Sequence, residues 1–479
     1  MRRCHPLLGA LLVLVLSNAC GLQDRYAYDA IRESYPAAPS RGRSPLPASP
    51  ALPEGALSLE DAIRVAVANN PDLQMAAARI RQAEALAAKA RSAYYPSVNV
   101  YTEYLRGNAP SAYLFKRLDQ RAFRFDEDFN DPDVFENYES GVSARWNLYR
   151  GGRDELGRRM ATTEQTISRL DRQALHNGMV ESVIQTYFDV LTAEAFIGIA
   201  RDAAATVDDQ LRVIRLRYRE GSALKSDVLS LEVRRAEAQE EEVRSRNRQQ
   251  LARTALATIM GIGIGRPLEL TASAAPALAV PGQFEAGLAY ALTHRPDLRA
   301  VREKVRQSRM GVDRAWAGYL PSIDAFGRYY YDDEDMDYAS DEDNWTAGLM
   351  FSWELFQGFA TRADVHEARA LFDAMLARDR KTALAVELEV KTAYLDLEEA
   401  GSRLAVARQR VLKAEESLEL VSRQYKGGAA TITRYLETEA ARNQARLSQA
   451  AARYDREKAM AAIARAIGAL PQAYPLADD

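Results

Sequence analysis

The chain repeats itself once, and this duplication limits its fold more than any other feature of its 479 residues. Two early motifs recur at an offset of 225 residues and later positions recur at 207, so the first copy carries an insertion of 18 residues. A register held over so long a stretch indicates two copies of one structural unit. We assign the units to residues 58–265 and 284–470, with a connecting loop at 266–283 and a tail at 471–479. The matched positions are Asn70-Pro71-Asp72-Leu73 with Arg295-Pro296-Asp297-Leu298, Tyr95-Pro96-Ser97 with Leu320-Pro321-Ser322, Trp146 with Trp353, Gly151 with Gly358, Tyr187 with Tyr394, Gly221 with Gly428 and Gly261 with Gly468.

Each unit contains a long stretch that favours helix. Between Asp154 and Arg217 no proline occurs and glycine is rare. These 64 residues can therefore form one helix of about 96 Å, at about 1.5 Å per residue. Apolar residues recur every seven positions, which indicates a coiled-coil seam rather than an ordinary amphipathic helix of a globular core. In the second unit the seam residues are Val390, Leu397, Leu404, Val411, Leu418 and Tyr425, with Val386, Ala393, Ala400, Ala407, Ala414 and Val421 four positions before each.

Turns that contain glycine interrupt the heptads at about 218–227 and 425–434 and predict the tips of two helical hairpins. The returning helices are expected at about 227–260 and 434–467, with Ser226 or Thr433 at their starts. Further helices are expected at about 59–94 and 284–319. One of these and one returning helix, laid end to end, match the length of the long helix.

Two segments in each unit alternate apolar and polar residues with a period of two, within about 97–148 and 322–355. Such alternation is typical of a strand with lipid on one side and water on the other. A half-buried strand of a soluble sandwich is the alternative. Acidic loops join the strands of each pair at 126–136 and at 332–335 with 341–343, and they lack the regular ligand spacing of a calcium site, so we expect solvated loops.

The N-terminus predicts export. Arg2 and Arg3 precede a short apolar run, which is typical of a secretory signal within residues 1–19. The segment Leu16-Ser17-Asn18-Ala19-Cys20-Gly21 resembles a bacterial lipoprotein processing site, so Cys20 is a candidate for acylation, with ordinary cleavage as the alternative. Residues 20–57 are rich in proline and predict an extended linker. No later run of 18 apolar residues predicts a membrane helix, which leaves a closed β-barrel as the way to span a bilayer.

Composition excludes several classes of function. The 63 Lys and Arg nearly balance 67 Asp and Glu, and no basic block favours nucleic-acid binding. The two cysteines, Cys4 and Cys20, precede the folded part, so no disulfide, thiolate metal site or cysteine nucleophile is expected there. The four histidines stand singly, and no nucleophile or acid–base set is recognisable. We therefore predict no cofactor, no metal and no enzymatic activity.

The ordered set of motifs resembles the TolC family of bacterial outer membrane efflux proteins. The resemblance covers about residues 58–470 and rests on the paired motifs above, including both hairpin tips. It implies a mainly α fold with a β-barrel part: a long α-helical coiled-coil barrel plus a transmembrane β-barrel. Each chain would give four strands, and a homotrimer would give twelve. Four strands cannot enclose a pore, since even an eight-stranded barrel is filled by its own side chains.

The resemblance also implies a function. The chain would be the outer membrane channel of a tripartite efflux or type I secretion system, a passive exit duct for small molecules or secreted protein. It would lie in the outer membrane and extend into the periplasm. An inner-membrane pump would supply the energy and would be joined to it through a periplasmic adaptor protein. The alternative is a periplasmic coiled-coil adaptor or scaffold, which has no need of strands with a continuous apolar face.

Two sets of site residues follow from the resemblance. Asp227 and Glu437 match positions that are acidic in similar proteins near the narrow end of the tunnel, whereas Arg434 stands where an acid is common. We hypothesise that Arg434 pairs with Asp227 or Glu437 across neighbouring hairpins and holds a closed state; the alternative is an exposed charge of little consequence. The residues expected to contact the adaptor at the tips are Gly221, Ser222, Ala223, Leu224, Gly428, Ala429, Ala430 and Thr431.

Overall fold

The computed structural model describes residues 55–126, 128–272, 280–335, 343–470 and 474. The predicted signal, Cys20 and nearly all of the linker lie outside the described residues, as does the tail apart from Tyr474. The chain divides into two units between Leu52 and Pro53. All of the described residues belong to the second unit, which begins at Pro53.

The first repeat opens with α3 (Leu59–Asn69) and α4 (Pro71–Arg91), followed by a short 3₁₀ turn (Ser92–Tyr94). The prediction of one continuous helix over 59–94 is therefore wrong. Asn70 breaks it, because a residue before proline is disfavoured in helical geometry. The Asn70 side chain then caps α4 by accepting hydrogen bonds from the backbone N–H groups of Asp72 (2.8 Å) and Leu73 (3.3 Å).

The second repeat breaks at the same place, between α8 (Phe284–His294) and α9 (Pro296–Trp316), and again a 3₁₀ turn (Ala317–Tyr319) follows. Arg295 occupies the position of Asn70 and cannot cap in the same way. Its guanidinium instead contacts Asp297 (2.6 Å) and Glu389 (2.5 Å), and it donates to the backbone oxygen of Ala466 (3.0 Å). The backbone therefore breaks in the same way before Pro71 and Pro296, but an amide cap stabilises the first break and ion pairs stabilise the second.

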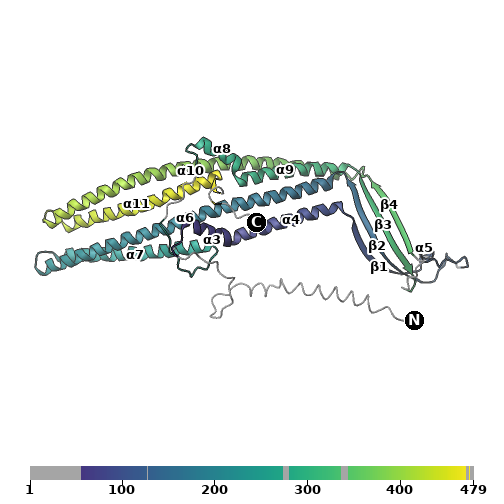
Figure 1. The fold of residues 1–479 in the computed structure, drawn as a ribbon, viewed down its shortest axis with the longest axis horizontal. Coiled ribbons are helices and arrows are strands. Elements are labelled where there is room, and N and C mark those ends of the chain that lie inside the picture. The colour runs from purple at the N-terminus through teal and green to yellow at the C-terminus, as the bar shows by residue number, and fades with distance from the viewer. Residues whose placement is uncertain (1–54, 127, 273–279, 336–342, 471–473, 475–479) are drawn as a thin grey trace. The chain divides into compact units, whose positions relative to one another are not determined.

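Two helices of 67 residues each form the long axis of the second unit, α6 (Arg153–Arg219) and α10 (Ala360–Lys426). The predicted uninterrupted helix is confirmed. The returning helices are α7 (Lys225–Ile259) and α11 (Ile432–Ile467). Along its length α6 packs on α4 and then α7, while α10 packs on α9 and then α11 (Figure 1). Contacts of α6 with α9 and α11 join the two repeats.

The heptad seam is confirmed as the packing surface of α10. All of its predicted positions are buried or half-buried, and the most enclosed are Val386 and Val390.

A tyrosine that recurs in both repeats anchors the middle of each long helix. The Tyr187 hydroxyl donates to the backbone oxygens of Thr271 (2.6 Å) and Leu57 (2.9 Å), and that of Tyr394 donates to the backbone oxygen of Pro281 (2.6 Å).

One stretch of α6 is apolar enough to cross a membrane by length and composition alone, with a mean hydropathy of 1.3 over 18 residues. The sequence prediction considered only uninterrupted apolar runs and missed it. Half of the stretch is buried within the chain, as in the core helix of a helical bundle. It is weak evidence for a membrane span.

The strands form one antiparallel sheet in the order β1-β2-β3-β4. They are β1 (Ser97–Gly107), β2 (Phe135–Arg150), β3 (Ser322–Asp333) and β4 (Asp343–Ser352). The central β2–β3 pair joins the two repeats, and in the described part of the chain β1 and β4 are edges with one neighbour each. The sheet continues from the ends of α4, α6 and α9 (Figure 1).

A short helix that the sequence reasoning missed, α5 (Pro110–Asp119), lies in the connection from β1 to β2. The corresponding connection in the second repeat runs only from Asp333 to Asp343. The insertion of 18 residues that changes the repeat offset is therefore placed here. Proline at the first helical position favours the start of α5 after Ala109.

Candidate functional site

One face of the sheet is apolar and exposed. Because paired residues in an antiparallel sheet share a face, Val100, Val142, Tyr329 and Trp345 form a single row across all four strands. These four side chains are 42–81% exposed. Soluble monomers rarely expose continuous apolar surface of this kind, so the face is suited to contact with lipid. Other exposed apolar residues on it are Val98, Trp146, Tyr149, Leu349 and Phe351.

The opposite face of the sheet is polar and carries a row of three carboxylates. Glu103 on β1 pairs in register with Glu139 on β2, and Glu139 pairs with Asp332 on β3. Like charges directly opposite one another destabilise a sheet, and Glu139 and Asp332 are also buried. This row therefore needs a cation close by.

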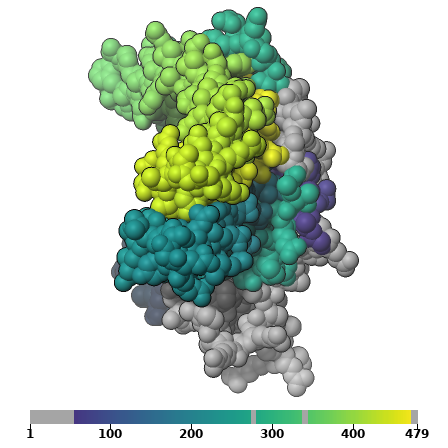
Figure 2. Space-filling view, turned by 90° about the vertical axis from the view of Figure 1, so that its left-hand side faces the viewer, coloured from purple at the N-terminus to yellow at the C-terminus, as the bar shows by residue number. Residues whose placement is uncertain are grey.

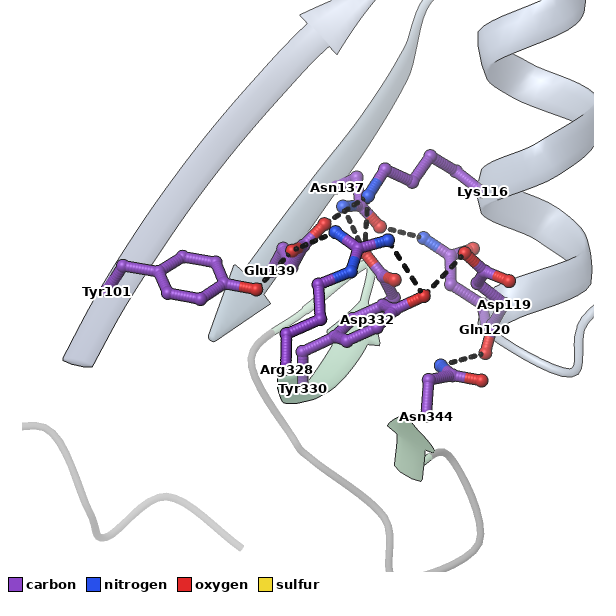
Figure 3. A network of polar contacts seen from close by, with 10 residues as sticks. All are labelled: Tyr101, Lys116, Asp119, Gln120, Asn137, Glu139, Arg328, Tyr330, Asp332 and Asn344. Carbon is purple, nitrogen blue, oxygen red and sulfur yellow. Dashed lines mark hydrogen bonds and ion pairs between the residues drawn. The ribbon is translucent and has the colours of Figure 1, made fainter. Parts of the chain in front are cut away.

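Lys116 of α5 supplies that cation. Its Nζ lies 2.6 Å from Oε2 of Glu139 and 2.8 Å from Oδ1 of Asp332 (Figure 3). Burial lowers the pKa of the Lys116 ammonium, but the hydrogen bonds to Asp332 and Glu139 outweigh burial and raise it above its usual value. Lys116 thus stays charged. Arg328 approaches Glu139 from the strand side, at 3.5 Å.

Buried amides complete this network. Gln120, just beyond α5, donates from Nε2 to Oδ1 of Asn137 (2.7 Å), and Asn137 donates from Nδ2 to Oδ1 of Asp332 (2.7 Å). All three side chains are buried. The expectation that residues 332–335 form a solvated loop is therefore wrong for Asp332, which belongs to β3 and is fully buried. No cluster of metal-ligand type occurs among the described residues.

The hairpin tips have the same backbone geometry in both repeats. In the first, the N–H of Ser222 donates to the oxygen of Arg217 (2.8 Å) and the N–H of Gly221 donates to that of Tyr218 (3.1 Å). The same bonds recur 207 residues later, from Ala429 to Gln424 and from Gly428 to Tyr425. This is the Schellman motif, which requires a left-handed residue, and Gly221 (φ 73°) and Gly428 (φ 79°) supply it.

The returning helices begin at Lys225 and Ile432, one residue before the predicted Ser226 and Thr433. The residues preceding α7 and α11 are Leu224 and Thr431. The hydroxyl of Thr431 accepts from the N–H of Arg434 (3.3 Å) and caps α11. Leu224 has no polar side chain, so Asp227 reaches back and accepts from its N–H (3.4 Å). Asp227 therefore has a structural role as a helix cap.

The other two constriction candidates lie together on α11. Arg434 contacts Glu437 at 3.7 Å, and both side chains are more than 60% exposed. Arg434 and Glu437 thus pair within one helix, and the hypothesised pairing across neighbouring hairpins stays a prediction. Six of the eight predicted tip residues are exposed, whereas Ala223 and Ala430 are half-buried against the apolar residues between the two hairpins. The exposed ones are Gly221, Ser222, Leu224, Gly428, Ala429 and Thr431.

Behind the tips the two hairpins lie side by side. Figure 2 looks onto the tips and shows α11, in yellow, against the teal hairpin of α6 and α7. Leu211, Ile214 and Leu231 of the first hairpin pack on Ile432 and Tyr435 of the second. This apolar seam holds the tips in place.

One turn beyond Tyr435, the seam contains a buried acid that the sequence reasoning missed. Glu439 is fully buried, and neither of its carboxyl oxygens has a hydrogen-bond partner. Its nearest cation is Arg442, at 4.0 Å. It borders a cavity of about 500 Å³ between α6, α7 and α11. The spacing of Ile432, Tyr435 and Glu439 on one helical face could have revealed it.

Long helical hairpins continuous with a sheet that has an apolar exposed face and a polar inner face define the class of bacterial outer membrane channels. The family model for outer membrane efflux proteins matches residues 62–262 and 288–469. The chain therefore belongs to the outer membrane efflux protein family, which confirms the resemblance found in its sequence. It is an outer membrane channel for efflux, with its helices in the periplasm.

Individual relatives agree with this assignment. The chain is 24% identical over 416 residues to the pyoverdine export outer membrane protein OpmQ of Pseudomonas putida, covering 86% of this chain and 85% of the relative. It is 23% identical over 412 residues to the outer membrane protein TolC of Vibrio cholerae, covering 84% and 89%. The solved CmeC outer membrane channel of Campylobacter jejuni superposes with a TM-score of 0.76 at 17% identity, covering 88% of this chain and 87% of the other.

Proposed function

We propose that this chain assembles as a homotrimer and forms the passive exit duct of a tripartite efflux or type I secretion system. The observation that carries the proposal is the apolar row Val100, Val142, Tyr329 and Trp345 on a sheet whose edges β1 and β4 have no outer neighbour in the described chain. Unpaired backbone groups are not tolerated in lipid. Joining β4 of one copy to β1 of the next removes every edge, and three copies give twelve strands.

The polar face of the sheet then lines a water-filled pore, which leads into the space between the helical rods. An inner-membrane pump drives transport. The cargo class is small molecules or secreted protein, because relatives include both a pyoverdine export protein and an alkaline protease secretion protein.

We assign the adaptor contact to the exposed hairpin tips. Their glycine turns present short side chains, which allow a partner's backbone or helix end to approach closely. Arg434 and Glu437 are the charges of the constriction, and Asp227 shapes the first tip as a cap. Acylation of Cys20, which lies outside the described residues, would tether the linker to the membrane. The mass of the mature N-terminus tests it.

Reconstitution tests the function. Purified mature protein should run as a trimer in detergent and should give discrete single-channel currents in a planar lipid bilayer. A monomer that is stable in plain buffer, or a trimer with no conductance, would overturn the proposal. The substitution Arg434→Ala should change the single-channel current, whereas Arg244→Ala, an exposed and ion-paired charge on α7, should not. An Arg434→Ala current equal to that of the natural protein would remove the constriction role.

A further inference from the structure

We propose that α5 lies inside the outer mouth of the pore and narrows it, and that Lys116 is the residue that holds it there. This inference rests on the proposed function, since it needs the polar face of the sheet to enclose the duct. It assigns a role to a helix that is an insertion relative to the second repeat.

The face on which α5 lies follows from strand register. The α5 segment contacts Glu139 on β2, Asp332 and Tyr330 on β3, and Asn344 on β4. Register places Glu139 opposite Asp332 and Tyr330 opposite Asn344, and both pairs belong to the polar face. Figure 3 shows these side chains converging on α5 from neighbouring strands. The helix is therefore on the side away from the apolar row.

The order of elements along the chain also shows at which end of the sheet α5 lies. Strand β1 begins at Ser97, directly after the helical rod, and ends at Gly107, so the connection that contains α5 lies at the far end of the strands. The rods occupy the periplasm, so the far end is the outer one. Three helices, each about 10–12 Å across with side chains, would fill much of the mouth of a twelve-stranded barrel.

Lys116 is the main anchor because it joins two strands at once. It bridges buried carboxylates of β2 and β3, and such a bridge is costly to break because it leaves the buried Asp332 without its cation and Glu139 with only Arg328, at 3.5 Å. Secondary anchors are neutral or exposed. Asn344 donates to the backbone oxygen of Asp119 (3.0 Å), and Arg117 pairs with the half-exposed Glu334 (2.6 Å). Without the lysine, α5 is left with contacts that are individually weak.

Single-channel recording on the full-length trimer tests this role. Lys116→Met should raise the conductance, because α5 leaves the pore. The triple substitution Lys116→Met, Glu139→Gln and Asp332→Asn should raise it too, and it leaves no buried charge that would unfold the sheet. Lys116→Arg, which keeps the positive charge, should give the same single-channel current as the natural protein. The matched control is Arg124→Met, an exposed cation of the same connection, which should leave the current unchanged.

The outcomes separate this inference from the function on which it rests. If the natural protein gives no current, the proposed channel function fails. Suppose that the natural protein conducts, and that Lys116→Met and the triple variant are folded and trimeric by circular dichroism and gel filtration. If these two variants then show the same conductance as the natural protein, the channel function stands and the role of α5 is refuted. Higher conductance in both variants, with the Arg124→Met control unchanged, supports it.

Discussion

Replacing the buried Glu439 by glutamine should stabilise the protein at neutral and alkaline pH. Glutamine has nearly the same shape and no charge. The Glu439 carboxyl is 1% exposed, has no hydrogen-bond partner and faces Arg442 only at 4.0 Å. An unsatisfied buried polar group costs about 1–3 kcal/mol, and a charged one costs more. Glutamine keeps the cost of an unpaired buried polar group and removes only the extra cost of the charge, so we expect Glu439→Gln to raise the free energy of unfolding by about 1 kcal/mol near pH 8.

The increase in the free energy of unfolding caused by Glu439→Gln should be larger at high pH than at low pH. Burial raises the pKa of the Glu439 carboxyl, against the lowering effect of Arg442 and Arg234. A carboxyl whose folded pKa is raised gives stability that is complete below its unfolded pKa and is lost as the pH rises through the folded value. The difference between Glu439→Gln and the natural protein should therefore shrink as the pH falls toward about 5.

Thermal unfolding of the purified protein in detergent, followed by the helical circular dichroism signal across this pH range, measures the effect. Glu437→Gln is the matched control, because Glu437 lies on the same helix but is 62% exposed. It should show little change. A destabilised Glu439→Gln variant, or a difference that does not vary with pH, would show that the carboxylate is ionised and well paired in the fold.

Three further substitutions test other parts of the structure by the same thermal unfolding. Phe359 has a left-handed backbone (φ 67°) where the first repeat has Gly152 (φ 82°), so Phe359→Gly should stabilise by up to about 1 kcal/mol; a lower melting temperature would contradict the strain argument. Tyr187→Phe removes the hydroxyl donor of the Thr271 carbonyl, whereas the Leu57 carbonyl still accepts from the N–H of Thr271, so the change should cost about 1–2 kcal/mol; an unchanged melting temperature would show that water replaces the hydroxyl. Gly261→Ala would place its Cβ 2.5 Å from the backbone oxygen of Asn69 at φ 67°, so it should destabilise more than Gly263→Ala, where the site is open.

Much of the helical architecture was predictable because its signals are local. A heptad repeat specifies a coiled coil whatever lies around it, and glycine in a turn permits the left-handed geometry of the tips. The strands were equally readable, since alternation such as that around Trp345 reports directly on two different surroundings. The duplication strengthened each of these predictions by supplying a second example.

The errors have physical reasons too. The break at Asn70 comes from proline restricting its neighbour. The helices α7 and α11 begin directly after Leu224 and Thr431, because the side chains of Asp227 and Thr431 cap them there in place of the nearby Ser226 and Thr433. Helix α5 has one strong local signal, Pro110, and was overlooked within an acidic connection.

By itself the sequence determined that the chain is duplicated and exported, and that it contains long helical hairpins and amphipathic strands. Each of these properties follows from the periodicity or composition of short segments. Only the tertiary structure decided which charges meet. Lys116 and Asp332 are 216 residues apart and Glu439 faces a different hairpin, so neither environment follows from neighbours in the chain. Burial and pairing of a charge depend on what long-range packing brings beside it, and that packing is a property of the whole fold.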